Sequence, residues 1–205
     1  MKVGIVGYAG CGKSTVFRWL TGVTPDPAKV SQQGQIGMAR VPDPRLDWLS
    51  EKFNPKKTTY ATLEFLDTPG LMPDERRDNP RRLGILRESG GLLVVLDGYS
   101  GADVARQLAN FRQEIIFADL EIVTNRISRL EDQIKKPRPA KEKEIQIAEL
   151  ELLKRINAHY EADKPAAELK LTADEEKLIR SFQLLTLKPE FVLINAGEET
   201  LKKDY

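Results

Sequence analysis

The sequence predicts an α/β fold with a mostly parallel sheet, interrupted by an inserted α-helical hairpin. Three observations support this prediction. The apolar segment Lys2–Val6 runs into a glycine-rich loop and then into a helix-forming segment. Later apolar segments alternate with helical ones, which is typical of a parallel α/β sheet. A long stretch with heptad spacing then separates the last two apolar segments.

Length and composition place the chain among ordinary globular proteins. Its 205 residues fit one domain with a smaller insert. Lys plus Arg number 32 against 31 for Asp plus Glu, so no global basic field attracts nucleic acid and we expect no DNA partner. A single cysteine excludes an intrachain disulfide. We see no targeting segment and no membrane-spanning run, so we expect a cytoplasmic protein without a membrane partner.

The first half of the chain supplies the beginning of the sheet. A helix is expected over residues 14–21, and a polar loop with prolines over residues 24–37. Strands are expected over residues 36–41 and 61–66, joined by a turn-rich connection. The charged segment 71–82, which contains two prolines, is expected to be irregular and mobile.

The second half contains the most apolar strand. Gly91–Asp97 includes a continuous apolar run, which is typical of a central parallel strand covered on both faces. A last short strand is expected over residues 191–194, ending at Asn195. A short helix is expected around residues 173–185.

Between these two strands the hydrophobic spacing becomes that of a helical hairpin. Prolines at 137 and 139 interrupt two heptad seams, and a helix rarely continues through such a pair. We therefore expect a nucleotide-binding unit over 1–116 plus 187–205, and a coiled-coil insert over 117–186. The expected seam residues are Leu120, Val123, Ile127, Leu130, Ile134, Ile145, Ala148, Leu152, Ile156 and His159.

The glycine-rich loop after the first strand fits the pattern G-x-x-x-x-G-K-[ST] of a phosphate-binding loop. Its glycines let successive backbone N–H groups turn inward to phosphate oxygens, and the helix that follows adds the positive end of its dipole. Lys13 is expected to stabilise the β- and γ-phosphates, and the Ser14 hydroxyl to ligate Mg²⁺. The expected phosphate-binding residues are Gly7, Gly10, Cys11, Gly12, Lys13, Ser14 and Thr15.

A second motif, Asp-Thr-Pro-Gly, follows the strand expected to end near residue 66. Asp67 is expected to hold Mg²⁺ through water, and Gly70 to offer its N–H to the γ-phosphate. Alone, this sequence could be a simple turn after a strand. About fifty residues after a phosphate loop, it favours a switch nucleoside triphosphatase over a P-loop kinase.

A third motif, Asn-Ala-Gly-Glu, follows the last strand. Switch GTPases carry N-K-x-D at this place, and its carboxylate pairs with guanine. In this chain Glu198 replaces the aspartate, and its extra methylene would crowd or miss the guanine edge. From spacing alone, Asn195 and Glu198 either contact the base or form an ordinary polar turn.

Beyond these motifs, the chain resembles the Obg-like P-loop proteins of the YchF type, within the translation-factor-related GTPases. The resemblance covers nearly the whole chain. The motifs that carry it are VPDPRLD at 41–47, NPKK at 54–57, ADLE at 118–121, KPA at 164–166 and LLTLKP at 184–189.

The resemblance implies a Ras-like domain interrupted by a coiled-coil hairpin, and association with ribosomes. The family's N-x-x-E base motif, which matches Asn195 and Glu198, is associated there with ATP binding as well as, or instead of, GTP binding. The family continues with a further strand, a helix and a small β-grasp-like domain. We therefore interpret the chain, which stops at Tyr205, either as a fragment or as a truncated form.

The chain departs from the family's pattern at several places. Gly10 replaces the usual asparagine, which leaves a monovalent-cation ligand unassigned. The switch-I threonine that completes the Mg²⁺ shell falls near Ser31, without its usual flanking residues. The charged segment 74–78 replaces a glycine-rich stretch. Leu71 stands where many Ras-like proteins carry a water-orienting glutamine, so hydrolysis should be slow and no catalytic base is assigned.

Three further features have two interpretations each. Cys11 is either a small loop residue or a redox-sensitive thiol whose oxidation blocks nucleotide binding; we favour the first. The basic hairpin tip at 135–143 either contacts ribosomal RNA or only solvates the hairpin. Trp19 and Trp48 are interpreted as core residues.

Taken together, the sequence favours a slow Mg²⁺-dependent nucleoside triphosphatase that acts as a switch, prefers ATP or accepts both ATP and GTP, and works with ribosomes. Two alternatives remain open. One is a non-catalytic module that binds ribosomes and uses nucleotide only to set its shape. The other is a GTP-specific switch.

Overall fold

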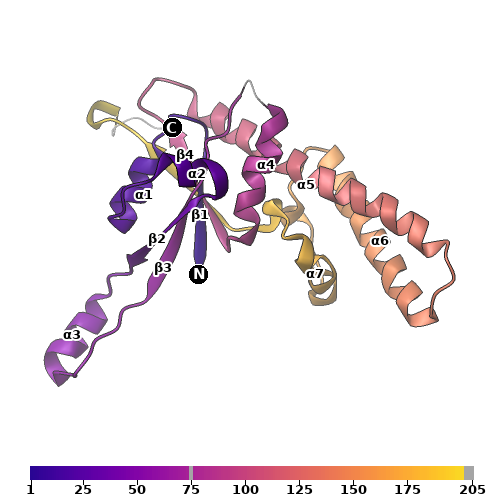
Figure 1. Ribbon diagram of the computed structural model, residues 1–205, viewed down its shortest axis with the longest axis horizontal. Helices are drawn as coiled ribbons and strands as arrows, with labels where there is room; N and C mark the ends of the chain where they lie inside the picture. The colour runs from indigo at the N-terminus through magenta and orange to yellow at the C-terminus, as the bar shows by residue number, and fades with distance from the viewer. Residues whose placement is uncertain (74–75, 201–205) are drawn as a thin grey trace.

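The fold was analysed in a computed structural model, which describes residues 1–73 and 76–200 (Figure 1). Within these residues the strands form one five-stranded sheet in the order β2-β3-β1-β4-β5. All neighbouring strands are parallel except β2 and β3, so the predicted mostly parallel sheet is confirmed. The strands are β1 (Lys2–Val6), β2 (Gln35–Arg40), β3 (Thr62–Asp67), β4 (Gly91–Asp97) and β5 (Glu190–Asn195).

Helices of very different length connect the strands. The two longest form the hairpin, and short 3₁₀ turns join the remaining segments. The α-helices are α1 (Lys13–Thr21), α2 (Pro27–Gln33), α3 (Pro44–Phe53), α4 (Asn79–Gly84), α5 (Val104–Ile134), α6 (Ala140–Glu161) and α7 (Ala173–Ile179). The 3₁₀ turns are η1 (Arg76–Asp78), η2 (Ile85–Glu88), η3 (Ala166–Glu168), η4 (Arg180–Phe182), η5 (Leu185–Leu187) and η6 (Glu198–Thr200).

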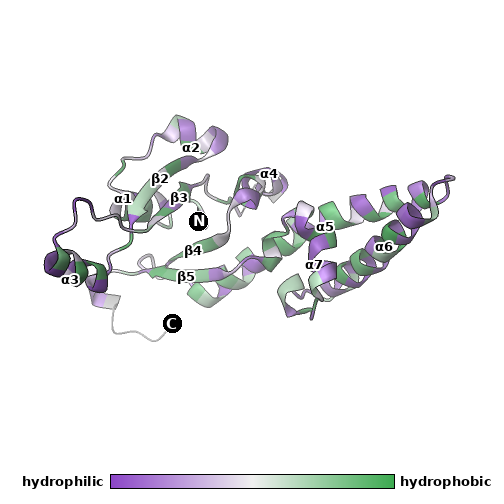
Figure 2. Ribbon diagram, turned by 90° about the horizontal axis from the view of Figure 1, so that it is seen from below, coloured by the Kyte–Doolittle hydropathy of each residue, from purple (hydrophilic) through white to green (hydrophobic). Residues whose placement is uncertain are grey.

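Strand β4 is covered on both faces, as its continuous apolar run predicts. Val95 belongs to a buried cluster with Val16 and Phe17 of α1. Leu92, Val94 and Leu96 belong to a second cluster that includes residues of α4 and α5. Figure 2 shows the hydrophobic residues along β4 and β5. Burial on both faces therefore fixes β4 in the middle of the domain.

The register of β1 determines where the functional loops meet. This strand lies between β3 and β4 and is parallel to both, with Ile5 opposite Asp67. The carboxyl ends of β1 and β3 therefore reach the same edge of the sheet. The loops that follow Val6 and Asp67 consequently start side by side, although 60 positions separate them in the sequence.

Helices α5 and α6 form an antiparallel hairpin that projects away from the sheet (Figure 1). Helix α5 has 31 residues and is continuous, with its first half packed on the sheet and its second half in the hairpin. It therefore crosses the expected domain boundary at 117 without interruption. Among the described helices, none combines the length and apolar character needed to span a membrane.

The expected seam of the hairpin is correct in α5 except for Ile134, which is not part of the packed cluster, and is only partly correct in α6. Leu120, Val123, Ile127 and Leu130 pack together with Leu152 and Ile156 of α6. Ile145 and Ala148, however, are exposed. Glu149 lies between the helices instead, where it accepts hydrogen bonds from Arg126 at 2.7 and 2.9 Å. The buried positions of α6 continue with Leu153 and Tyr160 rather than His159.

Two segments predicted to be irregular contain helices. Helix α2 lies within the expected loop at 24–37, and α3 lies within the expected turn-rich connection. Both begin at an Asp-Pro pair, in which the carboxylate of Asp26 or Asp43 accepts a backbone N–H and the proline occupies the first turn. This capping signal was overlooked, so the prediction of two plain loops was wrong.

Segment 71–82 also contains regular structure, because η1 and α4 begin within it. Residues 74 and 75 lie outside the described part. The expected helix around 173–185 is shorter than predicted: α7 ends at Ile179, and Gln183 has a left-handed φ of 47°.

The interpretation of the two tryptophans as core residues is wrong. Trp19 on α1 is 74% exposed and Trp48 on α3 is 56% exposed. Helix α1 directs Val16 and Phe17 to the sheet, which leaves Trp19 on the opposite side.

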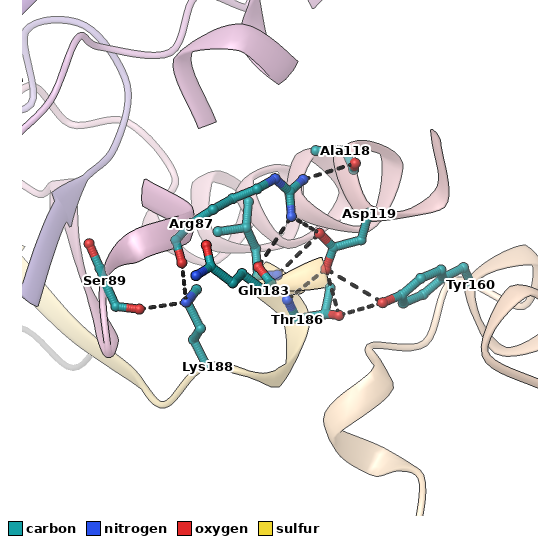
Figure 3. Close-up of polar contacts among 9 residues, drawn as sticks. Arg87, Ser89, Ala118, Asp119, Tyr160, Gln183, Thr186 and Lys188 are labelled. Carbon is teal, nitrogen blue, oxygen red and sulfur yellow. Dashed lines mark hydrogen bonds and ion pairs between the residues drawn. The ribbon is translucent and has the colours of Figure 1, made fainter. Parts of the chain in front are cut away.

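A buried carboxylate joins the hairpin to the nucleotide-binding unit (Figure 3). Asp119 of α5 is fully buried and accepts the backbone N–H groups of Leu185 and Thr186 at 3.1 and 2.9 Å. It also pairs with Arg87 at 2.7 Å, and the Tyr160 hydroxyl donates to it at 3.4 Å. One side chain therefore connects α5, α6, η2 and the segment that leads into β5.

We predict that Asp119→Ala will lower the free energy of unfolding by about 3 kcal/mol or more, because it leaves Arg87 without its carboxylate partner and two backbone N–H groups without their acceptor. Urea unfolding followed by circular dichroism measures this change. The matched control is Asp132→Ala, which removes an exposed ion pair with Lys135 and should change stability by less than about 0.5 kcal/mol. Equal effects of the two substitutions would contradict this account of Asp119.

Candidate nucleotide-binding site

The loop between β1 and α1 has the curled backbone that phosphate binding needs. Gly10 and Gly12 have φ values of 83° and 99°, in the left-handed region that favours glycine. A Cβ at Gly12 would lie 2.3 Å from Nδ2 of Asn195, so a larger residue would displace the Asn195 side chain. Gly12 is also the N-cap of α1, and it has no side chain that could accept a hydrogen bond from the first turn. The N–H groups of that turn therefore face the phosphate loop without a side-chain cap.

Lys13 lies inside this loop rather than in solvent. Its Nζ donates to the carbonyl of Tyr8 at 2.8 Å and lies 3.8 Å from Sγ of Cys11. Burial lowers the pKa of Lys13 below its usual value, and the nearby Asp67 opposes that effect. The ammonium group is thus held at the loop, where it can pair with phosphate oxygens.

Ser14 and Asp67 meet at the edge of the sheet, as the parallel register requires. The Ser14 hydroxyl donates to Oδ2 of Asp67 at 2.8 Å. Oδ1 of Asp67 is buried and has no hydrogen-bond partner among the described residues. Burial raises the pKa of this carboxyl, and the hydrogen bond from Ser14 opposes the rise.

This pair fits a magnesium ion. Burying a carboxylate oxygen without a partner raises the free energy of the folded protein unless a cation or a water molecule binds to it. Mg²⁺ is usually held by one or two protein oxygens together with water and substrate phosphates. No cluster of three His, Cys, Asp or Glu side chains suited to a metal occurs in the described residues.

The segment after Asp67 pairs directly with the phosphate loop. The N–H of Leu71 donates to the carbonyl of Gly7 at 3.0 Å, and the N–H of Ala9 donates to the carbonyl of Leu71 at 2.9 Å. A Cβ at Gly70 would lie 2.7 Å from Cα of Ala9. Gly70 is therefore needed for this close approach, which places its backbone beside the phosphate loop.

The Leu71 side chain points into the core, where it is 1% exposed and packs in the cluster that includes Leu83 and Leu86. It cannot orient water from there, in agreement with the sequence prediction.

A cleft of about 670 Å³ lies beside the Ser14–Asp67 pair. Ser14, Ser31 and Gly70 line it, together with Arg81 and Arg82 of α4. Ser31 is thus brought to the same cleft as Ser14. In this conformation its hydroxyl donates to the carbonyl of Ala28 within α2, at 2.9 Å.

The end of β5 also reaches the phosphate loop. Nδ2 of Asn195 donates to the carbonyl of Cys11 at 3.0 Å, which ties the expected base motif to the loop. Glu198 lies in the exposed turn η6, three residues further on.

Cys11 is 1% exposed and packs with Ile5, Phe17 and Val95 beneath the loop. Burial raises the pKa of its thiol despite the nearby Lys13. Both observations favour the interpretation of Cys11 as a small packing residue.

Sequence reasoning missed two sets of residues at this site. The Tyr99 hydroxyl donates to the carbonyl of Gly10 at 2.6 Å, from the loop that follows β4. Arg81 and Arg82 reach the cleft from α4. A tyrosine in a loop has no motif of its own, whereas the arginines could have been noticed as a basic pair shortly after Asp-Thr-Pro-Gly.

This combination of a phosphate loop, a helix N-terminus, a Ser–Asp pair and a switch segment on a mostly parallel sheet defines a P-loop nucleoside triphosphatase domain. Residues 2–148 match the family described as 50S ribosome-binding GTPase. The chain belongs to that family.

Comparison with individual proteins confirms the resemblance to YchF-type and Obg-like proteins. The chain is 28% identical over 214 residues to "Ribosome-binding ATPase YchF" of Bacillus subtilis (strain 168), covering 97% of this chain and 57% of that protein. It is 29% identical over 229 residues to "Obg-like ATPase 1" of Oryza sativa subsp. japonica, covering 100% and 54%. The chain therefore spans little more than half the length of these relatives.

A solved structure confirms the fold. The Schizosaccharomyces pombe YchF GTPase matches with a TM-score of 0.78 at 23% identity, covering 98% of this chain and 57% of that one.

We predict that Gly70→Ala will weaken nucleotide binding by about tenfold or more, which corresponds to about 1.4 kcal/mol, because the new methyl group displaces the phosphate loop at Ala9. Titration with a fluorescent ATP analogue measures the affinity. Gly84→Ala is the control, since its added Cβ meets nothing within 4 Å. Wild-type affinity in a folded Gly70→Ala protein would show that the close approach is dispensable.

Proposed function

We propose that this chain is a slow Mg²⁺-dependent nucleoside triphosphatase that acts as a switch. The observation that carries the proposal is the Ser14–Asp67 pair, held at 2.8 Å beside the phosphate loop with one carboxylate oxygen unpartnered. Membership in the family described as 50S ribosome-binding GTPase supports the same reaction class.

Each residue would have a defined task with nucleotide bound. The backbone N–H groups from Gly10 to Thr15 would bind the β-phosphate, and Lys13 would exchange its contact with Tyr8 for phosphate oxygens. Ser14 and Asp67 would hold Mg²⁺, directly and through water, with Ser31 as the candidate third ligand. The ion would neutralise charge on the β- and γ-phosphates.

Hydrolysis requires a water molecule to attack the γ-phosphorus. The water oxygen bonds to that phosphorus as its bond to the bridging oxygen breaks, which gives the nucleoside diphosphate and inorganic phosphate. One proton of the water stays on the phosphate and the other is released to solvent. The Gly70 N–H would steady the γ-phosphate. Leu71 contributes no water-orienting group, so the reaction should be slow unless a partner supplies one.

The buried position of Leu71 also favours one alternative, a non-catalytic module that uses nucleotide only to set its shape. In both cases the γ-phosphate would act on the segment paired with the phosphate loop at Ala9. The two proposals differ only in whether phosphate is released.

Base choice is proposed to depend on the end of β5. The hydrogen bond from Asn195 to the Cys11 carbonyl supports this proposal, because it joins the end of β5 to the phosphate loop. Glu198, one methylene longer than aspartate, disfavours the guanine edge. We therefore propose preference for ATP, or acceptance of both ATP and GTP, with a GTP-specific switch as the alternative.

A ribosomal partner is proposed from the names of the relatives, "Ribosome-binding ATPase YchF" among them. The basic hairpin tip at 135–143, which is hydrophilic in Figure 2, is the candidate contact with ribosomal RNA. Such a partner is consistent with a cytoplasmic protein. We further propose that residues 1–116 plus 187–205 and residues 117–186 are separate functional units.

We predict release of phosphate from Mg²⁺-ATP in a single-turnover experiment, above the rate in water alone. Ser14→Ala should abolish the Mg²⁺-dependent release of phosphate, because it removes a metal-binding hydroxyl, whereas Ser14→Thr should retain that release. Intact nucleotide binding without any phosphate release would exclude the enzyme and favour the non-catalytic module.

We predict that Glu198→Asp will raise the affinity for GTP relative to ATP, because the shorter side chain fits the two guanine donors. Parallel titrations with both nucleotides measure the ratio, and Glu199→Asp on the same turn is the matched control. An unchanged ratio would remove Glu198 from base recognition, and much tighter GTP binding by the wild type would favour the GTP-specific switch.

A further inference from the structure

Residues 40–60 form a projection that the proposed nucleotide chemistry does not use. This α3 arm consists of the end of β2, helix α3 and the extended segment that returns to β3. Both ribbon views show α3 at the end of the molecule opposite the tip of the α5–α6 hairpin (Figures 1 and 2). The arm can therefore contact a partner that the hairpin tip does not reach.

Helix α3 exposes large apolar side chains without contributing to the core. None of its residues is buried. Phe53 is 69% exposed, and Trp48 and Leu49 are 56% and 44% exposed. A shallow, almost wholly apolar groove is lined by Pro44, Arg45, Trp48 and Leu49. Aromatic side chains gathered on one projection indicate a binding surface rather than a packing role.

The same arm carries an excess of positive charge. It contains five basic and three acidic residues, whereas the whole chain has a net charge of only +1. Two of the acidic residues are engaged within the arm: Asp43 pairs with Arg45, and Asp47 accepts a hydrogen bond from the Tyr60 hydroxyl. Lys56 and Lys57 are exposed and have no ion pair with any described residue.

Local contacts hold the arm in one shape. Ser50 and Thr58 share a hydrogen bond of 2.6 Å between α3 and the returning segment. The Arg40 guanidinium lies 3.3 Å from the centre of the Tyr60 ring. Lys52 lies 4.8 Å from the centre of the Trp48 ring, which shows that this ring already accepts a cation on its face. Trp48 thus lies beside a cation, on an arm whose helix and returning segment are joined by hydrogen bonds.

We propose that the α3 arm binds unpaired RNA, with bases stacking on Trp48 and Phe53 and phosphates pairing with Lys56 and Lys57. Aromatic faces next to cations are the arrangement that single-stranded nucleic acid requires, because bases and charged phosphates alternate along it. A purely apolar protein partner would fit Trp48 and Leu49 but would leave the lysines unused. The inference rests on the proposed ribosomal association for the choice of RNA among polyanions.

The test uses the full chain and a fluorescein-labelled single-stranded RNA of about 12 nucleotides, a length in the range that such surfaces cover. Binding is followed by fluorescence anisotropy at several salt concentrations. Trp48→Ala should weaken binding about tenfold through lost stacking. The double variant Lys56→Ala/Lys57→Ala should lower the slope of log affinity against log salt by about 1.4, because two phosphate contacts are lost.

Matched controls lie elsewhere on the chain. Trp19→Ala removes a still more exposed tryptophan from α1, and Lys164→Ala/Lys170→Ala removes two exposed charges that lie in neither the arm nor the hairpin tip. Both should leave the affinity and the salt slope within twofold of wild type. Circular dichroism checks folding, which the arm variants should preserve because α3 has no buried residue.

Three results would each overturn the proposal. The wild-type chain does not bind the RNA, both arm variants bind it as tightly as wild type, or the control variants lose as much affinity as the arm variants. Titration of each variant with ATP distinguishes failure of the RNA-binding proposal from failure of the proposed nucleotide function. Arm variants that lose RNA binding but keep wild-type affinity for ATP would support the proposed RNA-binding role of the arm. A chain that binds RNA through the arm but fails to bind ATP would overturn the nucleotide proposal alone.

Discussion

The buried carboxylate of Asp119 is the contact on which the arrangement of the two parts depends. It accepts the backbone N–H groups at the beginning of η5, and so fixes the segment that leads into β5. β5 in turn places Asn195 against the phosphate loop. Arg87, paired with the same carboxylate, follows α4 and its cleft-lining arginines by a few residues. One acid thus connects the hairpin, the segment that follows α4 and the strand that ends at Asn195.

Motifs that carried the resemblance to the YchF-type family prove to be in contact with each other. Asp119 lies in the motif at 118–121, and Thr186 lies in the motif at 184–189. The sequence indicated that both match the family, but not that they meet across 67 positions. Periodicity and turn signals report on local structure, whereas a buried hydrogen-bond network depends on the assembled tertiary fold.

The sheet, the phosphate loop and the Ser14–Asp67 pair were predictable because each depends on local pattern and on parallel register. The exposure of Trp48 was not, because hydrophobic composition favours burial on average and only the fold shows that α3 stands away from the core. The shifted seam of α6 shows the same limit, since Glu149, paired with Arg126, lies between the helices, whereas spacing had placed the neighbouring Ala148 there. Roles of Ser31 and Glu198 stay predictions.

The uninterrupted length of α5 has a mechanical consequence. At 1.5 Å per residue its 31 residues extend for about 46 Å, from the sheet to the far end of the hairpin. A tilt of about 5° at the sheet would therefore move that far end by about 4 Å, provided the helix stays straight. The packed partner α6 resists bending along the way. Displacements too small to disturb the core could in this way become displacements that a neighbouring macromolecule would sense.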